Sequence, residues 1–397
     1  MEHAFSDNRN QHSDRCLVWG GYGWGNTGDD LTLAIALQDL RKGYGPHVTL
    51  LTPRSDHTGA AHPGVPLVGA PWDLPRGKFE QWLWHMADRA ASHGRKDASA
   101  ARWYRLALRF HRARPADGNW HEAFASASVL HLVGGGYLTD VFNLRYMLRP
   151  LHVARAMKLP IRTSPLGIGP FSDPGAGRGV ARALQGAEVV VRDEVSLRFC
   201  QLHGLNVEER PDDGFRLREV VGPGGCADRD QGARRSIGVC IFSQFSDRWS
   251  PMVENWWVNC LRSLVLAFPR WSIEGFCFHT DRDMDFRMTR DLFSRAGLDA
   301  NAVRPPDPDY RAAVASLRNF SAIVSTRFHA VVAASVFEIP CVAVAVNDYY
   351  EIKMRSAARH SRSPLSLLNP TQASPDAVIQ HLQQALGGNA PVQHPSA

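Results

Sequence analysis

The sequence lacks an apolar run long enough to cross a membrane, and no two of its cysteines form a CxxC pair. A bilayer-spanning helix needs about 18 or more consecutive apolar residues, so we expect no transmembrane helix. Seven cysteines, an odd number without metal-ligand spacing, argue against a disulfide framework or a zinc ribbon and favour a reducing compartment. The polar residues 1–15 also lack the apolar core of a signal peptide. We therefore expect a cytoplasmic protein.

Lysine is scarce as well, since only five of the 45 basic residues are Lys. The formal charge of +6 suits an anionic substrate, a membrane surface or nucleic acid, and alone it selects none of them. The excess is concentrated in 72–114, which holds ten basic and four acidic residues together with Trp82, Trp84 and Trp103. Two interpretations stay open for this segment: a basic helix at the inner face of an anionic membrane, or a solvated helix face whose tryptophans belong to the core. We expect no nucleic-acid partner.

The order of strand-like and helix-like patterns predicts the fold class. A strand, a glycine turn, a helix and a second strand follow one another in 16–52, and further strands are expected near 128–133, 161–166 and 188–191. A second series of the same kind begins with a strand at 236–242. We predict an α/β fold of two Rossmann-like domains in a GT-B-like arrangement, with the active site in the interdomain cleft. The predicted parts are an N-terminal domain at 16–210, a Pro- and Gly-rich linker at 211–235, a C-terminal domain at 236–386, and polar tails at 1–15 and 387–397.

The first glycine turn, at 23–28, reads GWGNTG and fits the pattern G-x-G-x-x-G. This pattern alone favours pyrophosphate binding at a helix N-terminus. The next strand, however, ends without the acidic residue that binds an NAD ribose, and Asp29 and Asp30 would repel a phosphate. The functional interpretation is that Asn26, Asp29 and Asp30 face the cleft, where they bind sugar hydroxyls or accept a proton from one. The alternative is a glycine turn whose carboxylates only stabilise the helix.

A second glycine turn, at 134–136, follows the strand expected near 128–133. Three consecutive glycines are entropically costly, and they are explained where a ligand or another backbone approaches closely. Asp140 follows this turn. It is expected either to bind a hydroxyl or to cap a helix.

Cationic residues follow three later strands, at the edge where ligands bind in open α/β sheets. Arg192 follows VVV and has the donor geometry for a phosphate or a carboxylate. Arg327 and His329 open an apolar helix, so both can reach an anion at that helix N-terminus. Lys353 follows the last of these strands. The alternative is that these residues have only structural roles.

Taken together, these pieces resemble the polysaccharide pyruvyl transferase family. The resemblance covers about 17–353 and is carried by the order of six motifs: GGYGWGNTGDD, VLHLVGGGYLTD, PLGIGP, VVVRDEVSLRFCQLHG, RPDDGF, and STRFHAVVAASVFEIPCVAV with YEIK. The family is similar in fold to GT-B proteins. Its members move the pyruvyl group of phosphoenolpyruvate onto two hydroxyls of a sugar in a cell-surface glycan, usually as a ketal.

The resemblance implies site residues as well as an activity. It assigns Arg192, Arg327, His329 and Lys353 to phosphoenolpyruvate, a co-substrate, and Asn26, Gly28 and Asp29 to the sugar acceptor. We add Gly135, Gly136 and Asp140 to the acceptor side, His329 as the general acid, and Asp29 or Asp30 as the base. The chain departs mildly from the family at Asp30 and Phe328, where Glu and Leu are usual, and the insertion at 72–114 is less usual.

Two other functions remain open from the residues alone. One is a GT-B glycosyltransferase that uses a sugar nucleotide, and the other is a non-catalytic glycan-binding protein of the same fold. An NADP-dependent oxidoreductase has only the first glycine turn and Arg54 in its favour. We expect no cofactor and no obligatory metal, because the sequence shows no cluster of metal-ligating residues. The acceptor sugar, its linkage to a lipid and the oligomeric state are left open.

Overall fold

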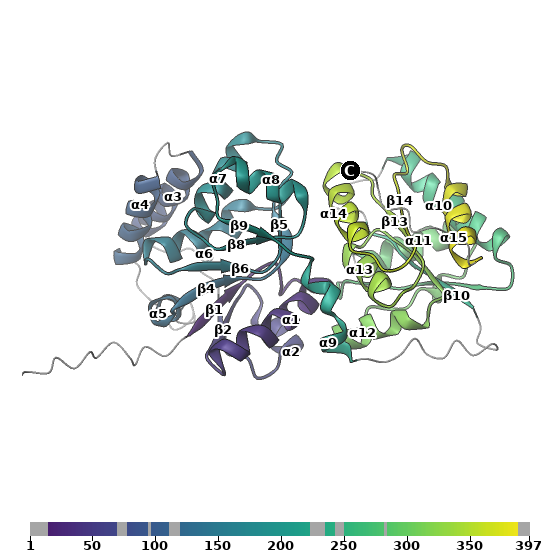
Figure 1. The fold of residues 1–397 in the computed structure, drawn as a ribbon, viewed down its shortest axis with the longest axis horizontal. Coiled ribbons are helices and arrows are strands. Elements are labelled where there is room, and N and C mark those ends of the chain that lie inside the picture. The colour runs from purple at the N-terminus through teal and green to yellow at the C-terminus, as the bar shows by residue number, and fades with distance from the viewer. Residues whose placement is uncertain are drawn as a thin grey trace, which may run out of the picture.

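The computed structural model describes residues 15–69, 78–93, 97–110, 120–222, 235–242, 250–281 and 284–387. The predicted tails therefore lie almost wholly outside the described residues, as do the ends of the segment 72–114. Figure 1 shows two α/β lobes, with helices α1 (Thr27–Tyr44), α9 (Arg218–Val221) and α12 (Tyr310–Ser316) where they meet. None of the described helices is both long and apolar enough to span a membrane.

The N-terminal half contains two parallel sheets rather than the single series of strands that the sequence predicts. The chain passes from the first sheet to the second at Gly134, where a Cβ atom would lie 2.8 Å from the carbonyl oxygen of Pro165. The strand expected near 128–133 is present at 129–132, and a further strand at 135–138 follows the glycine turn. The stretch expected as one strand near 161–166 is divided into two. The first sheet has the order β3-β2-β1-β4-β6, from β1 (Cys16–Trp19), β2 (Val48–Thr52), β3 (Leu67–Gly69), β4 (Val129–Leu132) and β6 (Ile161–Thr163). The second has the order β5-β7-β8-β9, from β5 (Gly135–Leu138), β7 (Leu166–Ile168), β8 (Val189–Val191) and β9 (Val207–Glu209).

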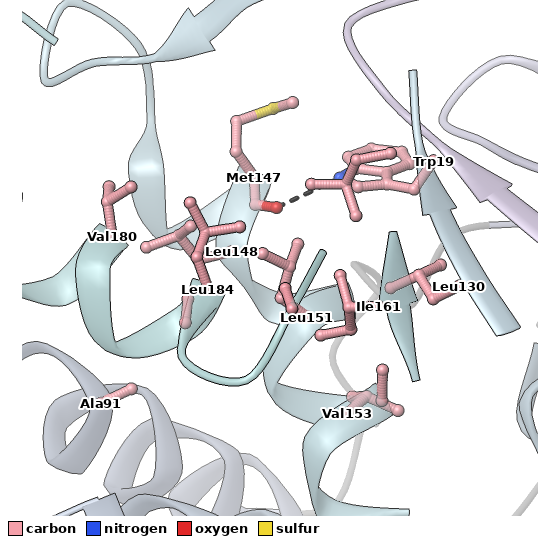
Figure 2. Packing of buried hydrophobic residues seen from close by; sticks show 14 of the residues in the cluster. Trp19, Ala91, Leu130, Met147, Leu148, Leu151, Val153, Ile161, Val180 and Leu184 are labelled. Atoms are coloured by element: carbon pink, nitrogen blue, oxygen red, sulfur yellow. Dashed lines mark hydrogen bonds between the residues drawn. The ribbon is translucent and has the colours of Figure 1, made fainter. Parts of the chain in front are cut away.

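The core of this half forms between these sheets and the surrounding helices. The helices are α2 (Ser55–Ala61), α3 (Lys78–His93), α4 (Asp97–Phe110), α5 (Trp120–Ser126), α6 (Leu144–Ala156), α7 (Pro174–Leu184) and α8 (Glu194–Leu202). Trp19 is fully buried and donates from Nε1 to the carbonyl oxygen of Met147 at 3.1 Å, which ties β1 to α6 (Figure 2). The segment expected to be helical thus contains the hairpin α3–α4, which packs against α6 and α7.

The C-terminal half has one parallel sheet of order β11-β10-β12-β13-β14. Its strands are β10 (Ser236–Cys240), β11 (Ser272–Gly275), β12 (Ala322–Ser325), β13 (Cys341–Val344) and β14 (Leu365–Leu368), and its helices besides α12 are α10 (Pro251–Ala267), α11 (Asp285–Ala296), α13 (Phe328–Val336), α14 (Asp348–Arg359) and α15 (Pro375–Leu386). The strands β10, β12 and β13 are buried along their whole length. Helices on both faces explain why they read as continuous apolar runs.

Helix α1 joins the two halves. Leu33 and Leu37 pack with the strands of the N-terminal half, whereas Leu31 and Ile35 belong to a cluster of C-terminal residues. Part of the stretch expected as a linker is also structured, because η2 (Asp213–Arg216) and α9 pack against α1. Residues 223–234 lie outside the described part of the chain.

Backbone hydrogen bonds connect the two halves beside α1. Thr27 N donates to Phe278 O at 3.0 Å, and Thr280 N donates to Gly25 O at 2.8 Å. The first glycine turn is therefore held directly against a loop of the C-terminal half.

Candidate active site

A cavity of about 380 Å³ lies between the two halves, a size typical of small-molecule sites. It opens at the carboxyl ends of β1, β12 and β13, where the topology of parallel sheets places ligands. Its walls are formed by Gly21, Trp24, Asn26, Asp29, Arg54, Gly136, Tyr137, Phe142 and Met147 from one half, and by Phe278, His279, Asp281, Met284, Arg327, Phe328, His329, Tyr349, Tyr350 and Lys353 from the other.

Arg327 is the best-anchored cation of this cavity. It precedes α13, and its Nε and Nη2 donate to the two oxygens of Asp285 at 3.1 and 2.8 Å. Asp285 is fully buried and also accepts from Phe278 N at 2.8 Å. Burial alone would lower the pKa of Arg327, but the Asp285 carboxylate outweighs it and the net shift is upward. The guanidinium is therefore a permanent charge in a fixed orientation.

His329 lies two residues further on, in the first turn of α13, pressed against α1. A Cβ atom on Gly28 would lie only 2.0 Å from His329 Nδ1, so glycine is required where the two helices meet. The other ring nitrogen, Nε2, lies 3.6 Å from Asp212 Oδ1. Burial alone would raise the pKa of Asp212, but His329 and Arg192 lower it well below its usual range. An ionised carboxylate thus lies beside the imidazole.

Arg192 does not line the cavity, which corrects the expectation that it contacts the donor. It is 1% exposed, and its Nη1 donates to Asp212 Oδ2 at 2.6 Å. Its Nη2 lies behind Gly136, where a Cβ atom would come within 2.7 Å of it. Within the described part of the chain, Nε and Nη2 of Arg192 have no hydrogen-bond partner. Arg192 therefore supplies positive charge from behind the wall.

Lys353 reaches the cavity from α14 through a group of aromatic rings. Its Nζ lies 5.4, 4.8 and 5.1 Å from the ring centres of Phe328, Tyr349 and Tyr350, and it donates to the Tyr349 hydroxyl at 3.3 Å. Tyr349 in turn donates to the carbonyl oxygen of Gly136. Burial and the charge of Arg192 lower the pKa of Lys353 to about 7. An incoming anion would restore its proton.

The opposite wall is formed by the first glycine turn. Asn26 caps α1 by accepting from Gly28 N at 3.1 Å, and its amide donates to Asp29 Oδ2 at 2.8 Å. Burial raises the pKa of Asp29, and the nearby His329 and Lys353 act in the opposite direction. Trp24 is 45% exposed and offers an aromatic face beside them. Carboxylate, amide and aromatic groups together suit a sugar.

Four residues predicted for this wall do not line the cavity. Gly28 is one of them, because it lies where α1 packs against His329. Asp30 points away from the cavity toward His57 and His62, at 3.2 and 3.7 Å, so it is not placed to act as the base. Asp140 does not line the cavity and does not cap a helix; it accepts from the backbone N–H groups of Ser172 and Asp173 in the loop before α7, whose N-cap is Asp173. Gly135 does not line the cavity; its φ of +151° belongs to the turn into β5.

Sequence reasoning missed several residues that complete the site. These residues are Asp285, which pairs with Arg327, Asp212, which lies beside His329, Tyr349, which accepts from Lys353, and His279, which lines the cavity. Asp212 lies in the motif RPDDGF, so its position was visible although its role was not. Asp285 follows no motif and lies 42 residues from its partner Arg327. In the described ranges, no group of three or more His, Cys, Asp or Glu residues could hold a metal ion; the expectation of no obligatory metal stays a prediction.

The sequence profile of the polysaccharide pyruvyl transferases matches residues 26–348, which is most of the chain and includes Asn26, Asp29, Arg327 and His329 of this cavity. The chain belongs to the polysaccharide pyruvyl transferase family. The resemblance inferred from six short motifs is thereby confirmed. A search of curated proteins finds no significant sequence match.

Solved structures confirm the fold class of this pyruvyl transferase family member. The S. aureus MnaA–UDP complex has a TM-score of 0.58 at 10% identity and covers 96% of this chain and 90% of that one. UDP-GlcNAc 2-epimerase of Methanocaldococcus jannaschii, in complex with UDP-GlcNAc and UDP, has a TM-score of 0.55 at 9% identity, with 96% and 94% covered. Trehalose 6-phosphate synthase of Burkholderia multivorans has a TM-score of 0.50 at 15% identity, with 96% and 90% covered. Such low identities show the shared GT-B-type fold alone.

Proposed function

We propose that this protein transfers the pyruvyl group of phosphoenolpyruvate to two hydroxyls of a sugar in a cell-surface polysaccharide or its precursor, with release of phosphate. The observation that carries this proposal is that two chemically different walls face each other across the cavity. Arg327, His329 and Lys353 form a cationic wall, and Asn26 and Asp29 face them across a cavity of about 380 Å³. Membership of the pyruvyl transferase family supports the same activity.

The donor would bind the cationic wall through both of its anionic groups. Phosphoenolpyruvate carries a carboxylate and a phosphate, and Arg327 has the planar donor geometry that either group prefers. The N-terminus of α13, whose N-cap Arg327 makes no side-chain capping bond, adds a favourable dipole. Lys353 offers a second cation at the same wall, and Arg192 adds charge from behind Gly136.

The transfer needs one proton delivered to carbon and two removed from hydroxyls. His329 protonates the methylene carbon of the enol, and the first sugar hydroxyl attacks the adjacent carbon while Asp29 accepts its proton. The C–O bond to phosphate then breaks, and the second hydroxyl attacks the same carbon to close the ketal. The second hydroxyl proton leaves with the phosphate, so that the products are the ketal and inorganic phosphate. Asp29 is the only one of the two predicted bases that faces the cavity.

The test is incubation with phosphoenolpyruvate and a panel of lipid-linked sugars, with phosphate release and product mass as the readouts. Lys353→Met should weaken phosphoenolpyruvate binding and lower turnover by about 10²–10³-fold, because it removes a cation in contact with the donor. Lys42→Met is the matched control, since Lys42 is exposed at the far end of α1. Arg327→Ala is less informative because it leaves Asp285 as an unpaired buried charge. Full activity of Lys353→Met would contradict the donor site.

The role of His329 is tested separately by His329→Gln. We expect phosphoenolpyruvate to bind this variant normally and turnover to fall by about 10²–10⁴-fold, since the amide cannot deliver the proton. Binding by calorimetry and turnover by phosphate release separate the two effects. Unchanged turnover would remove His329 from the acid role.

A sugar-nucleotide transferase is the second candidate, because the similar solved structures include enzymes in complex with UDP and UDP-GlcNAc. The product decides between the two. Release of a nucleoside diphosphate from a sugar nucleotide supports this candidate, whereas release of phosphate from phosphoenolpyruvate supports pyruvyl transfer.

We also propose that the α3–α4 hairpin contacts an anionic membrane, where a lipid-linked acceptor would lie. Phe79 and Trp82 are 59% and 48% exposed and stack on each other, and Trp82 meets Trp103 edge-on. Trp84 is buried, so the core interpretation holds for that residue. Binding to anionic liposomes that is lost when the exposed Arg102, Arg105 and Arg109 are changed to Glu would support the contact, and no binding would refute it.

A further inference from the structure

A second, larger cavity of about 780 Å³ lies in the N-terminal half, between α6, α7 and the α3–α4 hairpin. It is separated from the active-site cavity by the N-terminal turns of α6. Met147 lines the active-site cavity, whereas the neighbouring Leu144 and Leu148 line the second one. In Figure 2, Leu148 lies beside Leu184 of α7. Two cavities thus share one helix as a common wall.

The second cavity is positively charged. Arg145, Arg178 and Arg182 line it, against Asp88 and Asp173. Both carboxylates are already engaged. Asp88 accepts from Tyr104 at 2.5 Å, Arg145 at 2.6 Å and Arg149 at 2.7 Å, and Asp173 caps α7 by accepting from Gly175 N at 2.8 Å and Ala176 N at 3.1 Å. Arg178, by contrast, is exposed and has no ion-pair partner in the described ranges. The charge available to a ligand is therefore cationic.

A buried histidine in the same cavity lacks a hydrogen-bond partner. His152 is 8% exposed, stacks on Tyr104 with ring centres 5.2 Å apart, and lines the cavity. Neither ring nitrogen has a hydrogen-bond partner in the part of the chain that the structure describes. Burial and the charge of Arg155 lower the pKa of His152 to about 4, so the ring is neutral at pH 7. A neutral imidazole offers one donor and one acceptor, which a sugar hydroxyl can satisfy.

Glycines of α7 leave part of the cavity wall without side chains. The helix contains Gly175, Gly177 and Gly179 within five residues, although glycine weakens a helix. Gly177 has a packing reason, since a Cβ atom there would meet Phe171 at 3.2 Å and Phe199 at 3.4 Å. Gly179 has none, because a Cβ atom there would meet nothing within 4 Å. An open glycine that lines a cavity allows a ligand to approach the helix backbone closely.

We propose that this cavity is a subsite for an acidic sugar, one that bears a carboxylate or a phosphate, within the acceptor glycan. Arg178 and Arg182 bind its anionic group, and His152 and Arg145 bind its hydroxyls. The glycine side of α7 admits the ring. The proposal rests on the proposed function for the identity of the ligand as part of the acceptor. A polymeric acceptor passing round the start of α6 would present one sugar to each cavity.

The direct test is calorimetric binding to the full chain with saturating phosphoenolpyruvate, so that the active-site cations are occupied. The probes are methyl β-D-glucuronide, glucose 1-phosphate and the neutral methyl β-D-glucoside. We expect at least one acidic probe to bind about tenfold or more tightly than the neutral one, because charge-assisted hydrogen bonds are the stronger kind. The two acidic probes distinguish a carboxylate from a phosphate as the natural anionic group.

Variants locate the binding. Gly179→Leu fills the cavity and should abolish binding, whereas Gly179→Ala, the matched control, should retain it within about twofold and unfold at a slightly higher temperature. Arg178→Ala should weaken the binding of acidic probes by about tenfold. Arg198→Ala, which removes an exposed arginine on α8, should leave this binding unchanged. Thermal unfolding shows that each variant is folded.

Three outcomes would overturn the subsite: no binding of either acidic probe, undiminished binding to Gly179→Leu, or equal binding of acidic and neutral probes. None of these readouts needs turnover. If the acidic probe binds here and phosphoenolpyruvate is not consumed, the proposed function fails and the site stands. If pyruvyl transfer proceeds and these probes do not bind, the subsite alone fails.

Discussion

The two walls of the active-site cavity are constructed in opposite ways. On the C-terminal wall, functional side chains lie against buried carboxylates: Asp285 holds Arg327, and Asp212 lies beside His329. On the N-terminal wall, the decisive residues are glycines, because Gly28 makes room for His329 and Gly136 makes room for Arg192 and Lys353. One wall is defined by charges that cannot move, and the other by the absence of side chains.

Among single substitutions at the two walls, removal of the buried Asp285 carboxylate should have the largest effect on stability and donor binding. Asp285→Ala leaves Arg327 as an unpaired buried cation, so we expect the free energy of unfolding to fall by about 3–5 kcal/mol and phosphoenolpyruvate binding to be lost. Denaturant unfolding and calorimetry measure the two effects. Asp291→Ala is the matched control on the same helix, since Asp291 is 63% exposed and, among the residues that the structure describes, forms an ion pair only with Arg295. Equal stability of both variants would show that the buried pair does not anchor the wall.

A methyl group added at Gly28 should lower the rate of turnover. Gly28→Ala would place its Cβ 2.0 Å from His329 Nδ1, so the imidazole must leave its present position beside Asp212. We expect turnover to fall by about 10²–10⁴-fold, the range of a lost general acid, with a smaller loss of stability. Gly43→Ala, on the same helix with nothing within 4 Å of its Cβ, should leave turnover unchanged. A fully active Gly28→Ala enzyme would contradict the steric account.

The contrast between the walls also explains what could be predicted from the sequence. Asn26, Asp29, Arg327, His329 and Lys353 were all predicted, and all line the cavity, because each follows a strand whose carboxyl end is set by topology. Motif position does not reveal which way a side chain points. Asp29 and Asp30 are adjacent in a helix with 3.6 residues per turn, so only one of them can face the cavity.

Sequence patterns also do not predict how deeply a side chain is buried or which distant residue it pairs with, because both depend on tertiary packing. Arg192 lies at the predicted strand end, yet it is behind Gly136 because Asp212 draws its guanidinium into the interior. Asp285 is paired through tertiary packing with a residue 42 positions away, and no local periodicity marks it. The division of 161–166 into β6 and β7 likewise depends on the passage of the chain between two sheets, where the Pro165 carbonyl lies 2.8 Å from the position of a Cβ atom on Gly134.

The protonation of Lys353 determines whether the charge of the C-terminal wall changes with pH. Unlike Arg327, Lys353 is paired with a hydroxyl rather than a carboxylate, and burial lowers its pKa to about 7. In the free enzyme the ammonium form is therefore present below pH 7 and lost above it. If phosphoenolpyruvate binds only the protonated form, its dissociation constant should rise by about tenfold for each pH unit above the pKa.

Calorimetric titration between pH 7 and pH 9 measures this slope, in a range where the phosphate of the donor, with a second pKa of about 6, is largely ionised. Lys353→Arg is the sharpest variant, because a guanidinium stays charged throughout and should flatten the profile. The Lys42→Met control should keep the wild-type slope, since Lys42 is exposed and distant from the cavity. A profile that stays steep in Lys353→Arg would place the titrating group elsewhere, and a flat wild-type profile would mean that donor binding is not linked to the protonation of Lys353.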